Sequence, residues 1–293
     1  MTQRQATIIG AIAILIWGSL ALLTTYARKI PSFQLTAMTF TIAGMIVGLK
    51  WIVLRQSPRQ FLRQPWPVWL VGVGGLFGYH FFYFTALRFA PAAEASLVSY
   101  LWPLLIVIMS GLLPGERLRW FHVMGGCAAF LGAVMLILRG GTAFISETAI
   151  LGYAAALVCA VVWSGYSVHS RRFGEVPTDS VGVFCMITAV LAALCHGLWE
   201  TWVWPEDLGV WVAIVALGVG PVGMAFFAWD IGMKRGDIRL LGVLSYGAPA
   251  LSTLLLVLFN RTEPRWIIVE GCGLIILGAI VASLDKLQLV QKR

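Results

Sequence analysis

Long apolar runs divide this 293-residue sequence into segments of the length that a helix needs to cross a membrane. Such a helix takes about 20 apolar residues. Hydrophobic side chains make up 59% of the sequence and charged ones only 12%, whereas soluble chains carry about 25% charged residues. We therefore predict ten spans, at 8–27, 34–54, 67–87, 92–113, 119–138, 148–169, 181–200, 208–233, 238–259 and 266–284.

This pattern predicts an all-α polytopic membrane protein whose surroundings are the lipid bilayer. The connections between spans are short, so no soluble domain is inserted. The net charge of +8 would suggest nucleic acid binding in a soluble chain, but here we expect no nucleic acid partner, because basic residues are typical of cytoplasmic loops. No small-residue cleavage site follows the first span, so we expect it to stay in the protein.

The distribution of lysine and arginine predicts the orientation. With ten spans, 15 of the 21 basic residues fall on the side of the amino terminus and six on the other. Basic loops stay in the cytoplasm, so we expect both termini to be cytoplasmic. An even number of spans also places both ends of the chain on one side of the membrane, in agreement with this orientation.

An internal repeat appears when the chain is shifted by 146 residues without a gap. Trp17 then aligns with Trp163, and the pattern Ser-Tyr-x-x-Pro at 99–103 aligns with the same pattern at 245–249. We expect two five-helix domains, at 1–146 and 147–293. Because five is odd, the second would be inverted in the membrane. Inverted repeats are typical of secondary transporters.

The repeated prolines lie near the middle of spans. Pro103 and Pro249 each lack the N–H that would bond the carbonyl four residues back, at Ser99 and Ser245. Two interpretations remain open: a packed kink, or an open carbonyl, hydroxyl and phenol beside a cavity.

Several aromatic side chains lie too deep in the predicted spans to be anchors at the membrane interface. Tyr79 and Tyr83 are four residues apart, hence on one helix face. His80 beside them would either carry a proton during transport or only make a hydrogen bond. The candidate cavity residues are Trp17, Tyr79, His80, Tyr83, Ser99, Tyr100, Trp102, Trp163, Ser245 and Tyr246, with helix breaks at Pro103 and Pro249.

The absence of charge at midspan narrows the solute. No carboxylate is available for a cationic drug, and no fixed cation for a phosphate. We therefore expect a small neutral or zwitterionic solute. The sequence has no ATP-binding loop, no paired nucleophile and base, and no Cys-x-x-Cys among its five cysteines. We expect no cofactor, no metal and no enzyme activity.

Several short motifs carry a family resemblance: Trp17-Gly18, Ala90-Pro91-Ala92, Tyr100-Leu101-Trp102-Pro103, the loop at 114–118, and glycines 125, 126 and 132. The sequence resembles the drug/metabolite transporter superfamily with paired EamA-type domains, and is similar to its aromatic amino acid exporters of bacterial inner membranes. This implies alternating access around a cavity bounded by spans 1, 3, 4, 6, 8 and 9. In the second half, 260–264 and Trp163-Ser164-Gly165 depart from the motifs; the cavity residues, not these motifs, determine the substrate subgroup.

The resulting hypothesis is a secondary transporter of neutral amino acids, aromatic or large apolar, in the bacterial inner membrane. The outward direction of transport is inferred from the family resemblance alone. The alternatives are a carrier of other neutral metabolites or drugs, and a facilitative pore. We expect a monomer or a weak homo-oligomer.

Overall fold

The computed structural model describes residues 1–114, 118–138, 149–261, 263, 265–282 and 284. Every regular element in these ranges is a helix. The helices are α1 (Gln3–Gly18), α2 (Leu20–Tyr26), α3 (Ser32–Val53), α4 (Arg59–Leu62), α5 (Trp66–Phe89), α6 (Ala92–Ser99), α7 (Trp102–Ser110), α8 (Trp120–Leu138), α9 (Ile150–Ser170), η2 (Arg171–Phe173), α10 (Ser180–Trp199), α11 (Leu208–Val219), η3 (Gly220–Met224), α12 (Ala225–Arg235), α13 (Ile238–Leu244), α14 (Gly247–Leu258) and α15 (Trp266–Ala282).

Nine helical segments in the described ranges are long and apolar enough to cross a membrane. Each matches one of the first nine predicted spans, and the all-helical, multi-span fold is confirmed. The tenth predicted span contains α15, an apolar helix of 17 residues, which is shorter than the usual length of about 20. Ten spans therefore stay a prediction. The predicted domain boundary at 146/147 lies outside the described residues.

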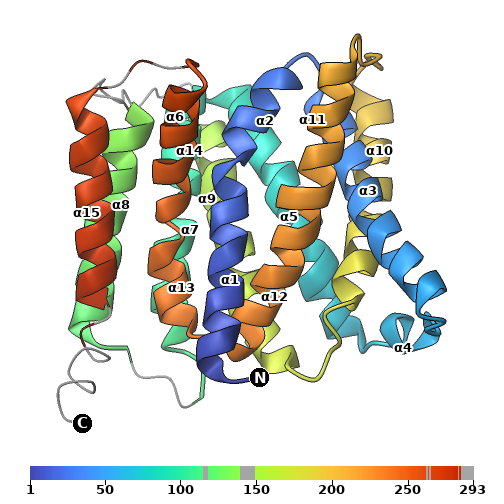
Figure 1. The fold of residues 1–293 in the computed structure, drawn as a ribbon, viewed down its shortest axis with the longest axis horizontal. Helices are drawn as coiled ribbons and strands as arrows, with labels where there is room; N and C mark the ends of the chain where they lie inside the picture. Colours follow the sequence, from blue (N-terminus) through green and yellow to red (C-terminus); the bar gives the residue numbers. More distant parts are fainter. Residues whose placement is uncertain (115–117, 139–148, 262, 264, 283, 285–293) are drawn as a thin grey trace.

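Figure 1 shows the long segments side by side, with α1 beginning at the lower end of the bundle and α2 ending at the upper end. We call the end where α1 begins the N-side and the opposite end the far side. Successive segments run in opposite directions. The connections at 27–31 and 200–207 lie on the far side, and α4 lies on the N-side.

Within the described ranges, four crossing segments are interrupted along their length, and local chemistry explains each break. The Ser19 hydroxyl, between α1 and α2, donates a 2.7 Å hydrogen bond to the Ile16 carbonyl, which competes with the helical ladder. The other breaks precede or contain a proline that lacks an N–H. They lie at residues 100–101, at the π-helical turn η3, and at residues 245–246.

The two repeated prolines follow their breaks, and at Ser245 the structure has the packed kink of the two interpretations left open. Pro103 is the second residue of α7, and Pro249 is the third residue of α14. The Ser245 carbonyl is not open, because it accepts a 3.1 Å hydrogen bond from the N–H of Ala248. The turn tightens instead of leaving the carbonyl free.

Glycines set the closest helix crossings. On α8 and α15, which lie together at one edge of the bundle (Figure 1), Gly125 faces Gly278 and Gly132 faces Gly271. A Cβ on Gly125 would lie 2.5 Å from the Gly278 carbonyl oxygen, so no larger residue fits this crossing without displacing a helix.

Candidate functional site

A cavity of about 510 Å³ lies among the interrupted segments, which is within the range of small-molecule sites, about 300–1,000 Å³. Its lining residues on α3, at 35–40, follow the far-side start of that helix. Those on α5, at 79–84, precede its far-side end. The cavity therefore occupies the far-side half of the bundle.

A cluster of four tryptophans closes the cavity toward the N-side. The ring centroids of Trp17 and Trp229 are 5.1 Å apart, and those of Trp102 and Trp163 are 6.2 Å apart. Exposure falls from 6% at Trp102 to 3% at Trp163 and 0% at Trp229. Such ring pairs stabilise the folded protein by about 0.5–1.5 kcal/mol each beyond their buried area. We call this packed layer of four tryptophans the floor of the cavity.

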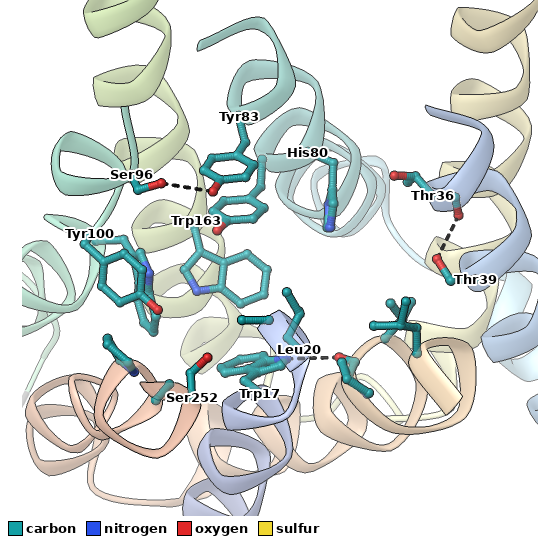
Figure 2. A pocket seen from close by; sticks show the side chains of 18 of the residues that line it. Trp17, Leu20, Thr36, Thr39, His80, Tyr83, Ser96, Tyr100, Trp163 and Ser252 are labelled. Carbon is teal, nitrogen blue, oxygen red and sulfur yellow. Dashed lines mark hydrogen bonds between the residues drawn. The ribbon is translucent and has the colours of Figure 1, made fainter. Parts of the chain in front are cut away.

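The floor also joins two of the helix breaks. The indole N–H of Trp17, two residues before the break at Ser19, donates a 3.0 Å hydrogen bond to the carbonyl of Pro221 in η3. Figure 2 shows this bond at the base of the cavity. An irregular carbonyl at membrane depth needs a partner of this kind, so Trp17 both lines the cavity and satisfies the turn.

Two tyrosines of α5 form one wall. Tyr79 and Tyr83 stack with their centroids 6.0 Å apart and their planes at 4°. The Tyr83 hydroxyl lies 3.3 Å from the hydroxyl of Ser96 on α6. Tyr79 also contacts Trp163, at 5.2 Å between centroids. The wall therefore connects α5 to the floor and to α6.

His80 lines the cavity beside this wall (Figure 2). Its Nδ1 lies 2.8 Å from the carbonyl oxygen of Leu76. Because a carbonyl can only accept, Nδ1 carries the proton in the neutral ring, and Nε2 is an acceptor. Its ring lies edge-on to Phe40, at 5.0 Å between centroids. The proton-carrying interpretation of His80 stays untested.

Hydroxyl groups missing from the predicted set complete the lining: Thr36 and Thr39 of α3, Ser96 of α6, and Ser252 and Thr253 of α14. Thr36 and Thr39 donate their hydroxyl protons to helix carbonyls, each at 2.8 Å. Serine and threonine are scattered through the apolar runs, and their spacing alone does not reveal which face meets the cavity.

The lining contains no Asp, Glu, Lys or Arg among the residues that the structure describes. Aromatic rings, hydroxyls, one histidine and the Pro221 carbonyl supply its chemistry. Nor does any group of three potential metal ligands occur in the described ranges. A neutral or zwitterionic solute with an aromatic part fits this lining, because a lone charge would be costly there.

Of the predicted residues, seven lie in the lining: Trp17, Tyr79, His80, Tyr83, Tyr100, Trp102 and Trp163. Pro249 lies there too, whereas Pro103 does not. Ser99, Ser245 and Tyr246 lie outside the lining and are at most 1% exposed.

Two of these buried residues make hydrogen bonds through their hydroxyl groups, Ser245 within its own segment and Tyr246 with another helix. The Ser245 hydroxyl donates to the Leu241 carbonyl, at 2.7 Å. The Tyr246 hydroxyl accepts from the N–H of Leu104, at 3.2 Å. Tyr246 thus satisfies an N–H in the first turn of α7, where the helix itself offers no acceptor.

Polar bonds hold the N-side together below the floor. Asp230, 3% exposed, accepts hydrogen bonds from Thr178 at 2.7 Å and forms an ion pair with Lys234 at 2.9 Å. Lys234 also donates to the Val176 carbonyl, at 2.9 Å. These contacts tie α12 to the connection between η2 and α10, so the N-side end of the cavity is closed.

Comparison with known proteins agrees with this geometry. The model of the EamA-like transporter family matches residues 5–138 and 150–284. The aromatic amino acid exporter YddG of Ancylobacter novellus is 57% identical, covering 97% of this chain and 99% of its own. The exporter of the same name from Escherichia coli is 24% identical, covering 97% and 98%. One solved crystal structure, 55% identical, covers 96% of this chain and 98% of its own with a TM-score of 0.91.

The bundle, its aromatic cavity and these relatives define a multi-pass transporter of the bacterial inner membrane. The chain belongs to the EamA-like transporter family, within the drug/metabolite transporter superfamily.

Proposed function

We propose that the protein is a secondary transporter that exports neutral amino acids with aromatic or large apolar side chains, and that it has no enzyme activity. The observation that carries this proposal is the uncharged, aromatic lining of the cavity. A zwitterion has no net charge to neutralise, and its ring can stack on Tyr79, Trp17 or Trp163. The names of the relatives as aromatic amino acid exporters support the same substrate class.

The topology we propose is ten spans in two inverted five-helix repeats, with both termini in the cytoplasm. The crossing of α8 and α15 supports the repeat. Gly125 and Gly271 are equivalent under the shift of 146 residues, as are Gly132 and Gly278. In the structure, Gly125 faces Gly278 and Gly132 faces Gly271. Replacing each glycine of one pair by its equivalent gives the other pair. Two copies related by a two-fold axis must show this relationship.

Transport would proceed by alternating access. With the N-side in the cytoplasm, the far-side position of the cavity and the closed tryptophan floor correspond to a state accessible from outside. Loading from the cytoplasm then requires the bonds of Asp230 and Lys234 to separate and a matching closure on the far side. We propose that a monomer suffices, because the cavity is built within one chain; a weak homo-oligomer is the alternative.

Exchange in liposomes tests this function. Liposomes carrying the purified protein are preloaded with unlabelled phenylalanine, tryptophan, threonine or glucose, and uptake of labelled phenylalanine is followed. We expect internal phenylalanine and tryptophan to accelerate uptake several-fold and glucose to have no effect. Equal, slow uptake in every batch would reject amino acids and return the solute to other neutral metabolites or drugs.

The same assay separates a carrier from a pore, because a pore shows no acceleration by internal solute. A matched pair of variants controls for the cavity. Ser252→Trp fills the cavity from α14 and should abolish exchange. Leu254→Trp, on the same helix and 49% exposed, should retain it.

A further inference from the structure

Hydrogen-bond donors and acceptors are separated within the cavity. At one end, the Tyr100 hydroxyl, the Trp163 indole N–H and the Ser252 hydroxyl have no hydrogen-bond partner in the described part of the chain. Figure 2 shows these three groups turned toward one region beside Trp17. Each can donate a proton, so this end offers donors to an incoming acceptor.

The other end offers acceptors only. The His80 Nδ1 proton is held by the Leu76 carbonyl, at 2.8 Å, which leaves the Nε2 lone pair for the cavity. The hydroxyl protons of Thr36 and Thr39 are likewise held by carbonyls of α3, so their oxygens present lone pairs. Figure 2 shows His80, Thr36 and Thr39 on the same side of the cavity.

This separation orients an amino acid. Its carboxylate carries a full charge and can only accept, so it needs donors. The α-ammonium is attached to the same carbon and must lie nearby, where the faces of Trp17 and Tyr100 favour a cation. The head group therefore belongs at the Tyr100, Trp163 and Ser252 end, and the side chain extends toward His80.

The distance between the ends suits one aromatic side chain. The centroid of Tyr79 lies 5.2 Å from Trp163 and 5.2 Å from His80, so a single tyrosine ring bridges them. A substrate ring stacked along Tyr79 spans the same gap. Its far edge then meets Nε2 of His80, with the rings of Phe40 and Phe226 around it.

We propose that His80 is a specificity-determining residue, whose Nε2 accepts a hydrogen bond from the indole N–H of tryptophan or the phenolic O–H of tyrosine. Phenylalanine has no such donor. The proposal rests on the proposed amino acid substrate and adds a preference within that class. One net hydrogen bond corresponds to about a three- to tenfold preference.

The test compares two substrates that differ in one N–H. Tryptophan and 3-benzothienylalanine have nearly the same shape, but sulfur replaces the N–H in the second. Apparent affinities of both are measured by competition with labelled phenylalanine in exchange. The wild type should prefer tryptophan about three- to tenfold. His80→Phe, which keeps a planar ring beside Phe40, should bring the ratio to about one, and His80→Gln, which restores an acceptor, should recover part of it.

His169→Phe is the matched control. The Nδ1 of His169 makes the same type of contact, 2.9 Å from the Gly165 carbonyl, but the residue does not line the cavity. The His169→Phe variant should prefer tryptophan over 3-benzothienylalanine by the same ratio as the wild type. Because the readout is a ratio, a loss of folded protein does not imitate the effect.

Two results would overturn the proposal while leaving amino acid transport intact. The wild type could treat both substrates alike, or His80→Phe could weaken both equally, as expected if His80 held the ammonium. If no amino acid supports exchange in the wild type, the proposed function itself fails, which is a distinct outcome.

Discussion

Trp17 and Trp163 meet at the floor of the cavity, with ring centroids 5.8 Å apart and planes at 70°. They occupy equivalent positions under the shift of 146 residues and belong to different halves of the chain. Each is also packed against Phe226. We therefore expect a relative movement of the two halves to rearrange this contact and so to couple solute binding to the conformational change.

Trp163→Phe should lower exchange several-fold while the amount of folded protein stays unchanged. Trp163 is only 3% exposed, so complete truncation to alanine would cost about 3–5 kcal/mol of stability and confuse the result. Phenylalanine keeps an aromatic ring at this position, removes less volume than alanine would, and eliminates the indole N–H. Exchange per folded molecule is the measurement. Trp66→Phe, at a position 73% exposed, is the control, and equal rates for both variants would contradict the role of Trp163.

The two equivalent tyrosines should respond differently to the loss of a hydroxyl. Tyr246→Phe leaves the Leu104 N–H without its acceptor, which should lower the unfolding free energy by about 1–3 kcal/mol with little effect on exchange. Tyr100→Phe removes a hydroxyl that faces the cavity, so it should weaken phenylalanine affinity and leave thermal stability unchanged. Thermal unfolding and exchange measured on both variants decide this, and identical profiles would be evidence against it.

Gly125→Ala and Gly278→Ala should each destabilise the protein by about 1–3 kcal/mol. In both, the added Cβ would lie 2.5 Å from a carbonyl oxygen of the opposite helix. Similar losses are expected because the two positions face each other. Gly273→Ala, on the same helix as Gly278 but with open space around its Cβ, should be neutral. Thermal stability in detergent is the readout; three equal melting temperatures would refute this crossing.

Thr178→Val should shift the conformational equilibrium toward opening of the N-side. The change removes a 2.7 Å hydrogen bond to the buried Asp230 carboxylate, and bonds to charged groups contribute about 1.5–3 kcal/mol. The accessibility from the N-side of a cysteine placed in the cavity should rise at least tenfold. Thr25→Val, which removes a hydroxyl bonded to the Leu22 carbonyl near the far side, is the control. No change in Thr178→Val would show that this bond does not hold the closed state.

The spans could be predicted because each depends on about 20 consecutive residues, whose summed hydropathy tolerates errors at the ends. The breaks within the helical segments were harder to predict. The prolines at 103 and 249 predicted two of them, but the break at Ser19 depends on a serine rotamer that bonds Ile16. At Gly220–Met224, a proline flanked by glycines does not by itself indicate a π-helical turn.

The cavity could be predicted only in part, because helix rotation decides which face lines it. Deep tryptophans and tyrosines are rare enough to be noticed, and most of them line the cavity. Tyr246 shows the limit, because its position matches that of Tyr100 in sequence while its side chain enters the other half of the bundle. Thr36, Thr39 and Ser252 were missed, since a lone hydroxyl in an apolar run most often bonds its own helix.

Protection of a cysteine by solute tests most directly whether amino acids bind in this cavity. Ser252→Cys places a thiol in the lining, and Lys29→Cys places one on the far side outside the lining, where the Lys29 side chain is 65% exposed. The unsubstituted protein gives the background rate of its five native cysteines. An impermeant thiol reagent is added to the far side, with and without phenylalanine. We expect phenylalanine to slow modification of the Ser252→Cys variant several-fold and to leave Lys29→Cys unchanged. Equal rates with and without phenylalanine in Ser252→Cys would contradict binding in the cavity.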